Sequence, residues 1–226
     1  MVRVAIIRFP GTNCDLEMAW AVKLASGDPE FVWHEDGGLE SFDAVIIPGG
    51  FTYGDYIRAG AIAALSPILE EIRECVEEGL PVLGVCNGMQ ILAEAELIPG
   101  TLTVNVGNRF ICDWVYLRVE RTNTPFTTKY EEGEVIRVPI AHAEGRYYYE
   151  NPEEIEDNVV FRFCGPDGDV SEEYNPNGSV GCIAGVVNDD GNVIGMMPHP
   201  ERAAHSLLNS DDGLRLFESL VEWCRS

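Results

Sequence analysis

The chain has 226 residues, 46% of them hydrophobic, and 38 acidic against 15 basic side chains give it a formal net charge of -23. This length suits one α/β domain over residues 1–226, and so acidic a surface disfavours a nucleic acid as partner because it repels phosphates. No apolar run approaches membrane-spanning length, and the seven scattered cysteines disfavour a disulfide scaffold or a zinc site and favour a reducing cytoplasm.

Strand-like and helix-like patterns alternate through the first hundred residues. Residues 2–8 predict a buried strand, and Thr12 or Asn13 can cap the helix that follows, whose first turn carries Asp15 and Glu17. Further apolar runs predict strands at 31–33 and 43–47, and helical spacing predicts a helix at 59–76. This alternation predicts a mostly parallel sheet with helices on both faces.

Gly84-Val85-Cys86-Asn87-Gly88-Met89-Gln90 is the most informative segment of the chain. An apolar run precedes it and helix formers follow, which is the strand–turn–helix context of a nucleophile elbow. Cys86 would start the helix, where the macrodipole favours a thiolate, and a Cβ at Gly84 or Gly88 would crowd so tight a turn. The backbone N–H of Asn87 can point at a developing oxyanion. The alternative is a buried cysteine in an ordinary connection.

From Thr101 onward the pattern changes to short alternating segments separated by turns. We expect strands at 115–119, 135–140, 159–163, 183–187 and 193–197. Asp189-Asp190-Gly191-Asn192 is typical of a hairpin turn between the last two strands, and residues 211–223 predict a closing amphipathic helix. The second half is therefore expected to be a β-rich insertion around the sheet.

His199 stands between two prolines, and the residue before a proline is pushed toward extended backbone. Side chains two apart in an extended segment point the same way, so Glu201 can lie beside His199. A histidine held by a carboxylate, with a remote cysteine as nucleophile, is typical of a catalytic triad. A histidine in a proline-rich surface turn is the alternative for this segment alone. Gly49 and Gly50, like Cys86, follow predicted strands, where open parallel sheets bind ligands.

The elbow cysteine and the downstream His-Pro-Glu, in this order, resemble the class I (triad) glutamine amidotransferases, which implies a flavodoxin-like α/β fold. Five segments are similar to the glutaminase subunits of purine biosynthesis: 8–15, 48–60, 139–145, 175–179 and 195–202. The resemblance runs essentially end to end. One departure is Ala143, which stands where these proteins usually have glycine, so the fine geometry of that backbone is open.

The resemblance implies that Cys86 attacks the side-chain amide of glutamine. His199 would take the thiol proton and later protonate the departing ammonia, while Glu201 would orient the imidazole. We expect the backbone N–H groups of Gly50 and Asn87 to form the oxyanion hole. Water would then cleave the thioester and leave glutamate.

Other residues are expected to bind the substrate or order the site. The expected substrate contacts are Gly49, Gln90, His142 and Ala143. His142 and Glu144 are also a rival acid and base, but we interpret His142 as a positioning or structural residue. Asp55 and Arg58, in the loop that marks the subfamily, are expected to contact the partner or order the site rather than take part in the chemistry.

The chain carries no Walker A motif, no dinucleotide fingerprint and no paired-carboxylate magnesium signature. We therefore expect no cofactor and no metal on this chain, and we expect ATP and magnesium on a partner. The resemblance implies that this partner is a synthetase subunit, with a small accessory subunit. Since free ammonia becomes ammonium in bulk water, a docked synthetase with a shielded passage is the expected arrangement.

The acidic side chains are spread along the whole sequence, and Lys23 and Lys129 are its only lysines. One interpretation is a solvated coat suited to a cytoplasm of high ionic strength, where salt screens the self-repulsion. The other is complementarity to a basic partner surface. The even spread favours the coat.

Two further functions remain open alongside the purine-pathway glutaminase. One is another hydrolase on the same scaffold, such as the glutaminase of a different amidotransferase or a DJ-1-like cysteine enzyme. The other is a regulatory module that kept the fold without catalysis. An intact Cys86, His199 and Glu201 set favours an enzyme, and the Tyr-Gly-Asp-Tyr loop at 53–56 favours the purine case.

Overall fold

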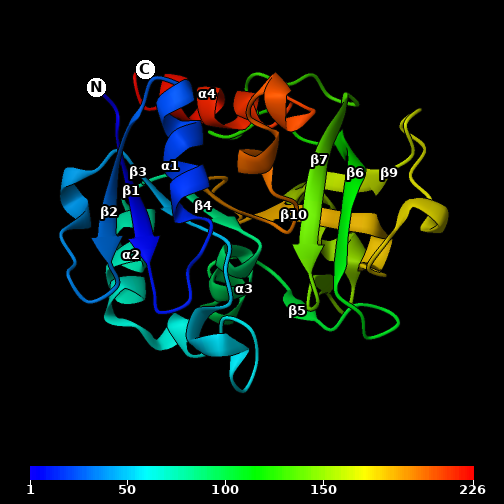
Figure 1. Ribbon diagram of the computed structural model, residues 1–226, viewed down its shortest axis with the longest axis horizontal. Coiled ribbons are helices and arrows are strands. Elements are labelled where there is room, and N and C mark those ends of the chain that lie inside the picture. Colours follow the sequence, from blue (N-terminus) through cyan, green and yellow to red (C-terminus); the bar gives the residue numbers. More distant parts are fainter.

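Nine strands form one sheet in the computed structural model, which describes residues 1–226 (Figure 1). Their order across the sheet is β2-β1-β3-β4-β11-β10-β9-β6-β7. The first five in this order run parallel: β2 (Asp28–Trp33), β1 (Arg3–Arg8), β3 (Ala44–Ile47), β4 (Val82–Val85) and β11 (Val193–Met196). The expected α/β class with its parallel sheet is confirmed.

Four helices flank the parallel strands. They are α1 (Asp15–Leu24), α2 (Pro67–Glu77), α3 (Asn87–Glu94) and α4 (Leu214–Trp223). Right-handed crossovers place α1 on one face of the sheet and both α2 and α3 on the other. The closing helix α4 returns to pack beside α1 (Figure 1). The helices therefore cover the apolar strands on both sides, as the alternating pattern predicts.

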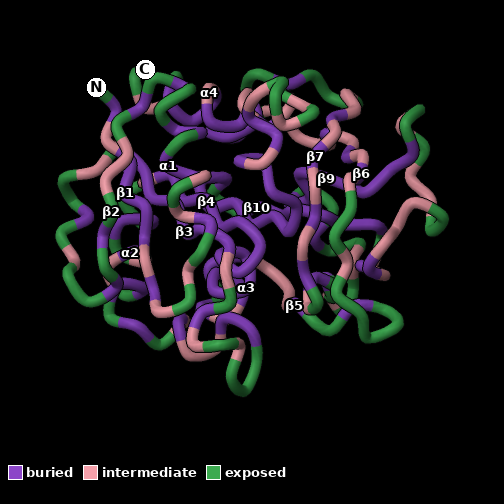
Figure 2. The backbone as a smooth tube through the Cα atoms, viewed as in Figure 1, coloured by how far each residue is buried: buried purple, intermediate pink, exposed green.

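The β-rich second half extends the same sheet with antiparallel strands. They are β10 (Ile183–Val187), β9 (Val159–Cys164), β6 (Ile111–Val119) and β7 (Val135–His142). β10 and β11 form the expected hairpin, and β5 (Thr101–Thr103) pairs with β8 (Arg146–Tyr148) in a small separate sheet. A single cluster of 64 buried residues runs through both halves, seen as the purple interior in Figure 2.

Two local predictions were wrong. The helix expected at 59–76 begins only at Pro67, because the residue before a proline takes extended backbone and Ser66 has ψ 144°. Leu65, one of the apolar residues whose helical spacing suggested the longer helix, is 86% exposed. Neither Thr12 nor Asn13 caps α1: the helix starts after Cys14 without a side-chain cap, and Thr12 Oγ1 accepts from the backbone of Phe9.

The carboxyl ends of β1, β3, β4 and β11 meet at one edge of the sheet, where the loops that follow them come together (Figure 1). The loop after β3 is exposed at its tip, with Tyr56 74% and Ile57 83% accessible. None of the helices is long and apolar enough to cross a membrane. The edge formed by these loops is the place where the chemistry-bearing residues must be sought.

Candidate active site

Cys86 occupies a strained turn between β4 and α3. Its φ of 52° and ψ of -107° lie in a region that side-chain-bearing residues rarely adopt. A Cβ on Gly84 would lie 2.5 Å from Leu92 Cδ1, and one on Gly88 would lie 2.0 Å from the carbonyl oxygen of Ile47. Neither glycine has a positive φ, so both are required for close approach rather than for backbone angles. The strain is concentrated on the cysteine itself.

His199 and Glu201 form a buried pair beside the elbow. His199 Nδ1 and Glu201 Oε1 are 2.6 Å apart, and the two residues are 2% and 0% exposed. The backbone N–H of His199 donates to the carbonyl of Pro139, which fixes the segment against β7. The expected extended run is wrong at Glu201, which lies in the 3-10 turn Pro200–Ala203, yet the turn still brings the carboxylate to the imidazole.

The charges around His199 favour a protonated imidazole. Burial opposes the charged form, but Glu201 and Cys86 together raise the pKa of His199 well above its ordinary value. Because Glu201 takes Nδ1, the buried and otherwise unpartnered Nε2 is the atom left to exchange a proton. The arrangement suits a thiolate–imidazolium pair, the activated form of a nucleophilic cysteine.

A cavity of about 320 Å³ opens over Cys86 and His199. Pockets of this size hold small organic ligands and amino acids. The remaining lining residues are Asn13, Cys14, Gly50, Phe51, Asp55, Gln90, Phe110, Ala141, His142, Ala143, Glu144 and Arg202. Of the other residues singled out from sequence, Gly49, Asn87, Arg58 and Glu201 do not border the cavity.

Gly50 borders the cavity, but its lack of a side chain has a further reason. A Cβ there would lie 2.6 Å from the carbonyl oxygen of Gly11 and 2.9 Å from Thr12 Cα. The glycine therefore lets the loop after β1 pack against the loop after β3. An alanine at this position would displace both loops, whatever the substrate requires.

Asn87, the first residue of α3, ties the loop after β3 to the elbow. Its Oδ1 accepts from the backbone N–H of Thr52, and its Nδ2 donates to Gln90 Oε1. Gln90 Nε2 in turn donates to the carbonyl of Glu144 at 2.7 Å. This chain of hydrogen bonds holds three walls of the cavity together. Although Gln90 borders the cavity, its side-chain oxygen and nitrogen are both hydrogen-bonded to other residues of the protein.

His142 is a buried residue of the cavity wall, and its imidazole is neutral. Burial, the main cause, and the nearby His199 lower the pKa of His142 to about 4. Asn105 accepts from His142 Nδ1 and donates to the His142 carbonyl, which holds the segment after β7 in place. A positioning role thus fits better than acid catalysis. Ala143 has an exposed side chain and no positive φ, so alanine is unstrained there.

Asp55 and Arg58, expected to contact the partner or order the site, have different surroundings in the structure. Asp55 lines the cavity with a buried, unpartnered Oδ1, and burial and the nearby Glu144 raise its pKa to about 6. Arg58 pairs with Glu94 of α3 instead, and its side chain is 54% exposed. Only Asp55 is placed to meet a small molecule in the cavity.

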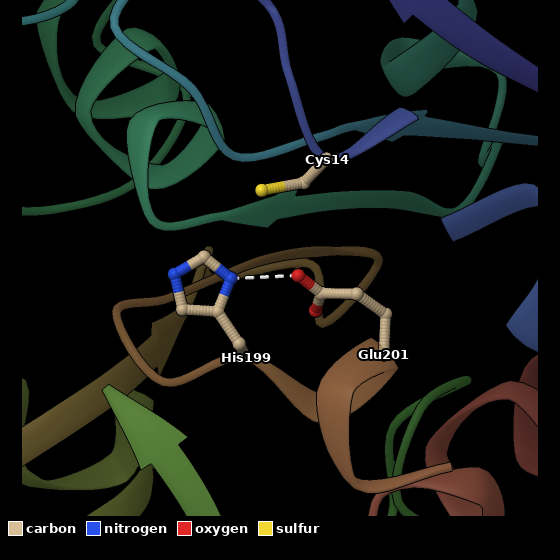
Figure 3. A group of neighbouring side chains, drawn as sticks. All are labelled: Cys14, His199 and Glu201. Atoms are coloured by element: carbon tan, nitrogen blue, oxygen red, sulfur yellow. Dashed lines mark hydrogen bonds and ion pairs between the residues drawn. The ribbon is translucent and has the colours of Figure 1, made fainter. Parts of the chain in front are cut away.

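Among the cavity residues that were not singled out from sequence, Cys14 and Arg202 carry reactive or charged side chains. Cys14, just before α1, lies beside the His199–Glu201 pair (Figure 3). Arg202, the next residue after Glu201, donates from Nη2 to Cys14 Sγ at 3.1 Å. Both fall in segments that carried the family resemblance. No spacing rule links positions 14 and 202, however, because only the fold brings the loop after β1 against the turn after β11.

Comparison with known proteins gives consistent matches over the whole chain. The profile of a CobB/CobQ-like glutamine amidotransferase domain matches residues 1–224. A protein of Methanopyrus kandleri named phosphoribosylformylglycinamidine synthase subunit PurQ is 93% identical over 226 residues, covering all of both chains. A protein of Pyrococcus furiosus with the same name is 57% identical, again over the full length of both.

Solved structures agree with these matches. A chain of the structure described as PurLQS from Thermotoga maritima matches with a TM-score of 0.89 and 42% identity over 98% of each chain. A glutamine amidotransferase of Thermotoga maritima matches with a TM-score of 0.62 at 20% identity, over 100% of this chain and 99% of that one, and shares the fold.

Proposed function

Since the chain belongs to the CobB/CobQ-like glutamine amidotransferase family, we propose that Cys86, His199 and Glu201 hydrolyse glutamine within phosphoribosylformylglycinamidine synthase. The chain is the glutaminase subunit of that enzyme and serves purine biosynthesis. The observation that carries the residue assignment is the meeting of a strained elbow cysteine and a buried histidine–carboxylate pair at one cavity.

The reaction begins with the Cys86 thiolate and the His199 imidazolium. The sulfur attacks the side-chain amide carbon of glutamine, and the backbone N–H groups of Gly50 and Asn87 stabilise the oxyanion. His199 then gives its Nε2 proton to the amide nitrogen, so ammonia leaves and a glutamyl thioester remains on Cys86. Glu201 keeps Nδ1 protonated and the ring oriented, since the two atoms are 2.6 Å apart.

Water completes the cycle. His199, now neutral, takes a proton from a water molecule as the water oxygen attacks the thioester carbon. Collapse of the tetrahedral intermediate releases glutamate and restores the Cys86 thiolate beside the His199 imidazolium. Each proton that enters the site therefore passes through a single nitrogen, His199 Nε2, which is buried and has no other partner.

Ammonia is used by the partner synthetase subunit, which converts formylglycinamide ribonucleotide to formylglycinamidine ribonucleotide. The small accessory subunit completes the complex. We place ATP and magnesium on the synthetase, because this chain lacks motifs for either. A reducing cytoplasm suits a chain whose seven cysteines are all free thiols, most of them buried.

One assay run four ways tests the division of labour. Wild type and Cys86→Ala are each assembled with the synthetase and supplied with glutamine or with an ammonium salt. Cys86→Ala should abolish synthesis from glutamine and keep synthesis from ammonium, because the acceptor and ATP sites lie on the partner. Loss of both activities in a normally assembled complex would show that the division is wrong.

Labelling tests the nucleophile separately. A glutamine-like electrophile such as diazo-oxo-norleucine should modify Cys86, because it alone of the two cavity cysteines sits at the elbow. Peptide mapping that places the adduct on Cys14 would overturn the assignment. The exposed Cys112 serves as the internal control for nonspecific alkylation.

A further inference from the structure

A second thiol lies against the histidine–carboxylate pair. Cys14 Sγ, a ring nitrogen of His199 and a carboxylate oxygen of Glu201 all lie within 4.8 Å of one another (Figure 3). All three residues are buried, with Cys14 1% exposed. Cys14 takes no part in glutamine hydrolysis by Cys86, His199 and Glu201, so the presence of this thiol needs another explanation.

Gly49 leaves the space between these groups open. A Cβ on Gly49 would lie 2.9 Å from His199 Cε1, 3.0 Å from Cys14 Sγ and 3.5 Å from Cys86 Cβ. Both thiol-bearing residues and the imidazole therefore border one small volume that any larger residue at position 49 would fill. The glycine was expected to contact substrate, yet its surroundings are these three side chains.

Catalysis leaves part of the cluster without a partner. It accounts for the unpartnered His199 Nε2, but Glu201 Oε2 is also buried and unpartnered, and no step uses that atom. A sulfur, an imidazole nitrogen and a carboxylate oxygen are the donors that Zn²⁺ takes in proteins, whereas Mg²⁺ and Ca²⁺ prefer oxygen alone. The Arg202 guanidinium, 3.1 Å from Cys14 Sγ, can balance a thiolate there until a metal replaces it.

We propose that Cys14, His199 and Glu201 bind a thiophilic divalent cation of the Zn²⁺ class. The metal–sulfur bond forms as the Cys14 thiol releases its proton to solvent, and the metal–nitrogen bond forms as the His199 imidazolium releases one of its ring protons to solvent. The carboxylate donates a lone pair, and water fills the remaining position. Donor atoms about 2.0–2.3 Å from a tetrahedral ion lie roughly 3.3–3.8 Å apart. Donor atoms at the 4.8 Å limit of the cluster would therefore have to approach one another by about 1.0–1.5 Å.

The bound ion blocks hydrolysis, an effect that rests on the proposed function. An imidazole held by the ion no longer exchanges protons with Cys86 and the departing ammonia, and the Glu201 carboxylate no longer orients it. The excess negative charge of the chain, -23 overall, raises the local concentration of cations. The same residues that act on glutamine when the site is empty thus form the metal site when the ion is present.

Direct binding tests the site without reference to activity. Wild type, Cys14→Ser and Cys112→Ser, freed of metal, are titrated with Co²⁺ while the near-ultraviolet sulfur-to-cobalt band and the visible bands are recorded. Wild type and Cys112→Ser should bind one Co²⁺ with the sulfur band, displaced by Zn²⁺. Cys14→Ser should lose the band and bind at least tenfold more weakly. A sulfur band that survives Cys14→Ser at full strength overturns the proposal.

Protection from alkylation keeps the test independent of the variant's folding. In wild type, Zn²⁺ should slow iodoacetamide modification of Cys14 and leave that of the exposed Cys112 unchanged. Equal modification of Cys14 with and without Zn²⁺ contradicts the site.

Glutamine hydrolysis then tests the inhibition. Half-inhibition of the assembled enzyme should need at least tenfold more Zn²⁺ for Cys14→Ser than for wild type. Equal sensitivity would mean that Zn²⁺ acts through Cys86 and His199 alone, which overturns the role of Cys14. If no variant hydrolyses glutamine but the Co²⁺ results hold, the proposed function fails and the metal site stands.

Discussion

The parallel and antiparallel halves of the sheet contribute differently to the cavity. The parallel half supplies the reacting atoms, because Cys86 and His199 follow the adjacent strands β4 and β11. The antiparallel half supplies part of the cavity wall. The backbone carbonyl of Ala141 accepts a hydrogen bond from Cys86, and that of Glu144 accepts one from Gln90. The two segments that meet at the cavity also differ in backbone, since the elbow cysteine has a positive φ and no residue of β7 does. Chemistry thus depends on a few side chains, and shape on many backbone groups.

Glu201→Gln changes the half of the molecule that supplies the reacting atoms, and we expect the largest effect on catalysis from this variant. The amide cannot stabilise the imidazolium and can stabilise the wrong tautomer, so kcat should fall by about 10³–10⁴. Steady-state glutamine hydrolysis by the assembled enzyme measures it. Glu222→Gln, on an exposed side chain that pairs with Lys129, is the matched control and should leave kcat unchanged. A fall of less than tenfold in Glu201→Gln would remove Glu201 from the triad.

Gly88→Ala tests whether close approach, rather than backbone angle, requires the elbow glycine. The added Cβ would lie 2.0 Å from the carbonyl oxygen of Ile47, so β3 and α3 must move apart. We expect this to lower the free energy of unfolding by about 2–3 kcal/mol. Gly133→Ala, where nothing lies within 4 Å but φ is +79°, should cost about 1 kcal/mol. Denaturant unfolding compares them. Equal losses at both positions would contradict the packing argument.

His142→Gln probes the wall, where we expect a smaller effect. The ring is neutral and holds the segment after β7 through Asn105, so its loss should raise KM about tenfold and change kcat little. The pH profile of kcat should also keep its wild-type shape. A large fall in kcat with an altered profile would instead make His142 an acid or base.

Asp55→Asn tests the electrostatic coupling between the two halves, because Asp55 and Glu144 both line the cavity and repel each other when charged. Burial and Glu144 raise the pKa of Asp55 from 3.8 to about 6 in the folded protein. The folded state then holds a proton that the unfolded state has lost, so wild-type stability falls as pH rises from about 4 to about 6.

The variant should therefore be more stable than wild type at pH 8 and equal to it at pH 4. The gain is about 1 kcal/mol after allowance for the partial exposure of the carboxyl group. Unfolding in denaturant at the two pH values measures it. A variant that gains nothing at pH 8 would mean that the carboxylate is already well solvated.

The acidic coat covers both halves, so salt should not distinguish them. Self-repulsion is unscreened at low ionic strength, and the melting temperature should rise by a few degrees as potassium chloride is added. Sucrose at matched osmolality controls for general stabilisation. A flat or falling melting temperature would favour a basic partner surface as the reason for the acidity.

The elbow could be predicted from sequence because its causes are local. The two glycines that flank Cys86 and the change from strand to helix lie within about a dozen residues of one another. The structure has the turn at the position that these signals predict. The helix expected at 59–76 failed for an equally local reason: apolar spacing was weighed above the proline at 67, which prevents helical backbone at Ser66. The apolar periodicity correctly predicted which side chains of α2 are buried, but it placed the beginning of the helix too early.

The sequence by itself determined the fold class, the nucleophile's turn and the pairing of His199 with Glu201, because each follows from neighbours along the chain. Only the tertiary structure decided that Cys14 and Arg202 join that pair, since nothing along the chain relates position 14 to position 199. It also showed why Gly49 and Gly50 lack side chains: their neighbours come from other loops. Contacts between loops after separate strands depend on sheet order, which a sequence pattern does not contain.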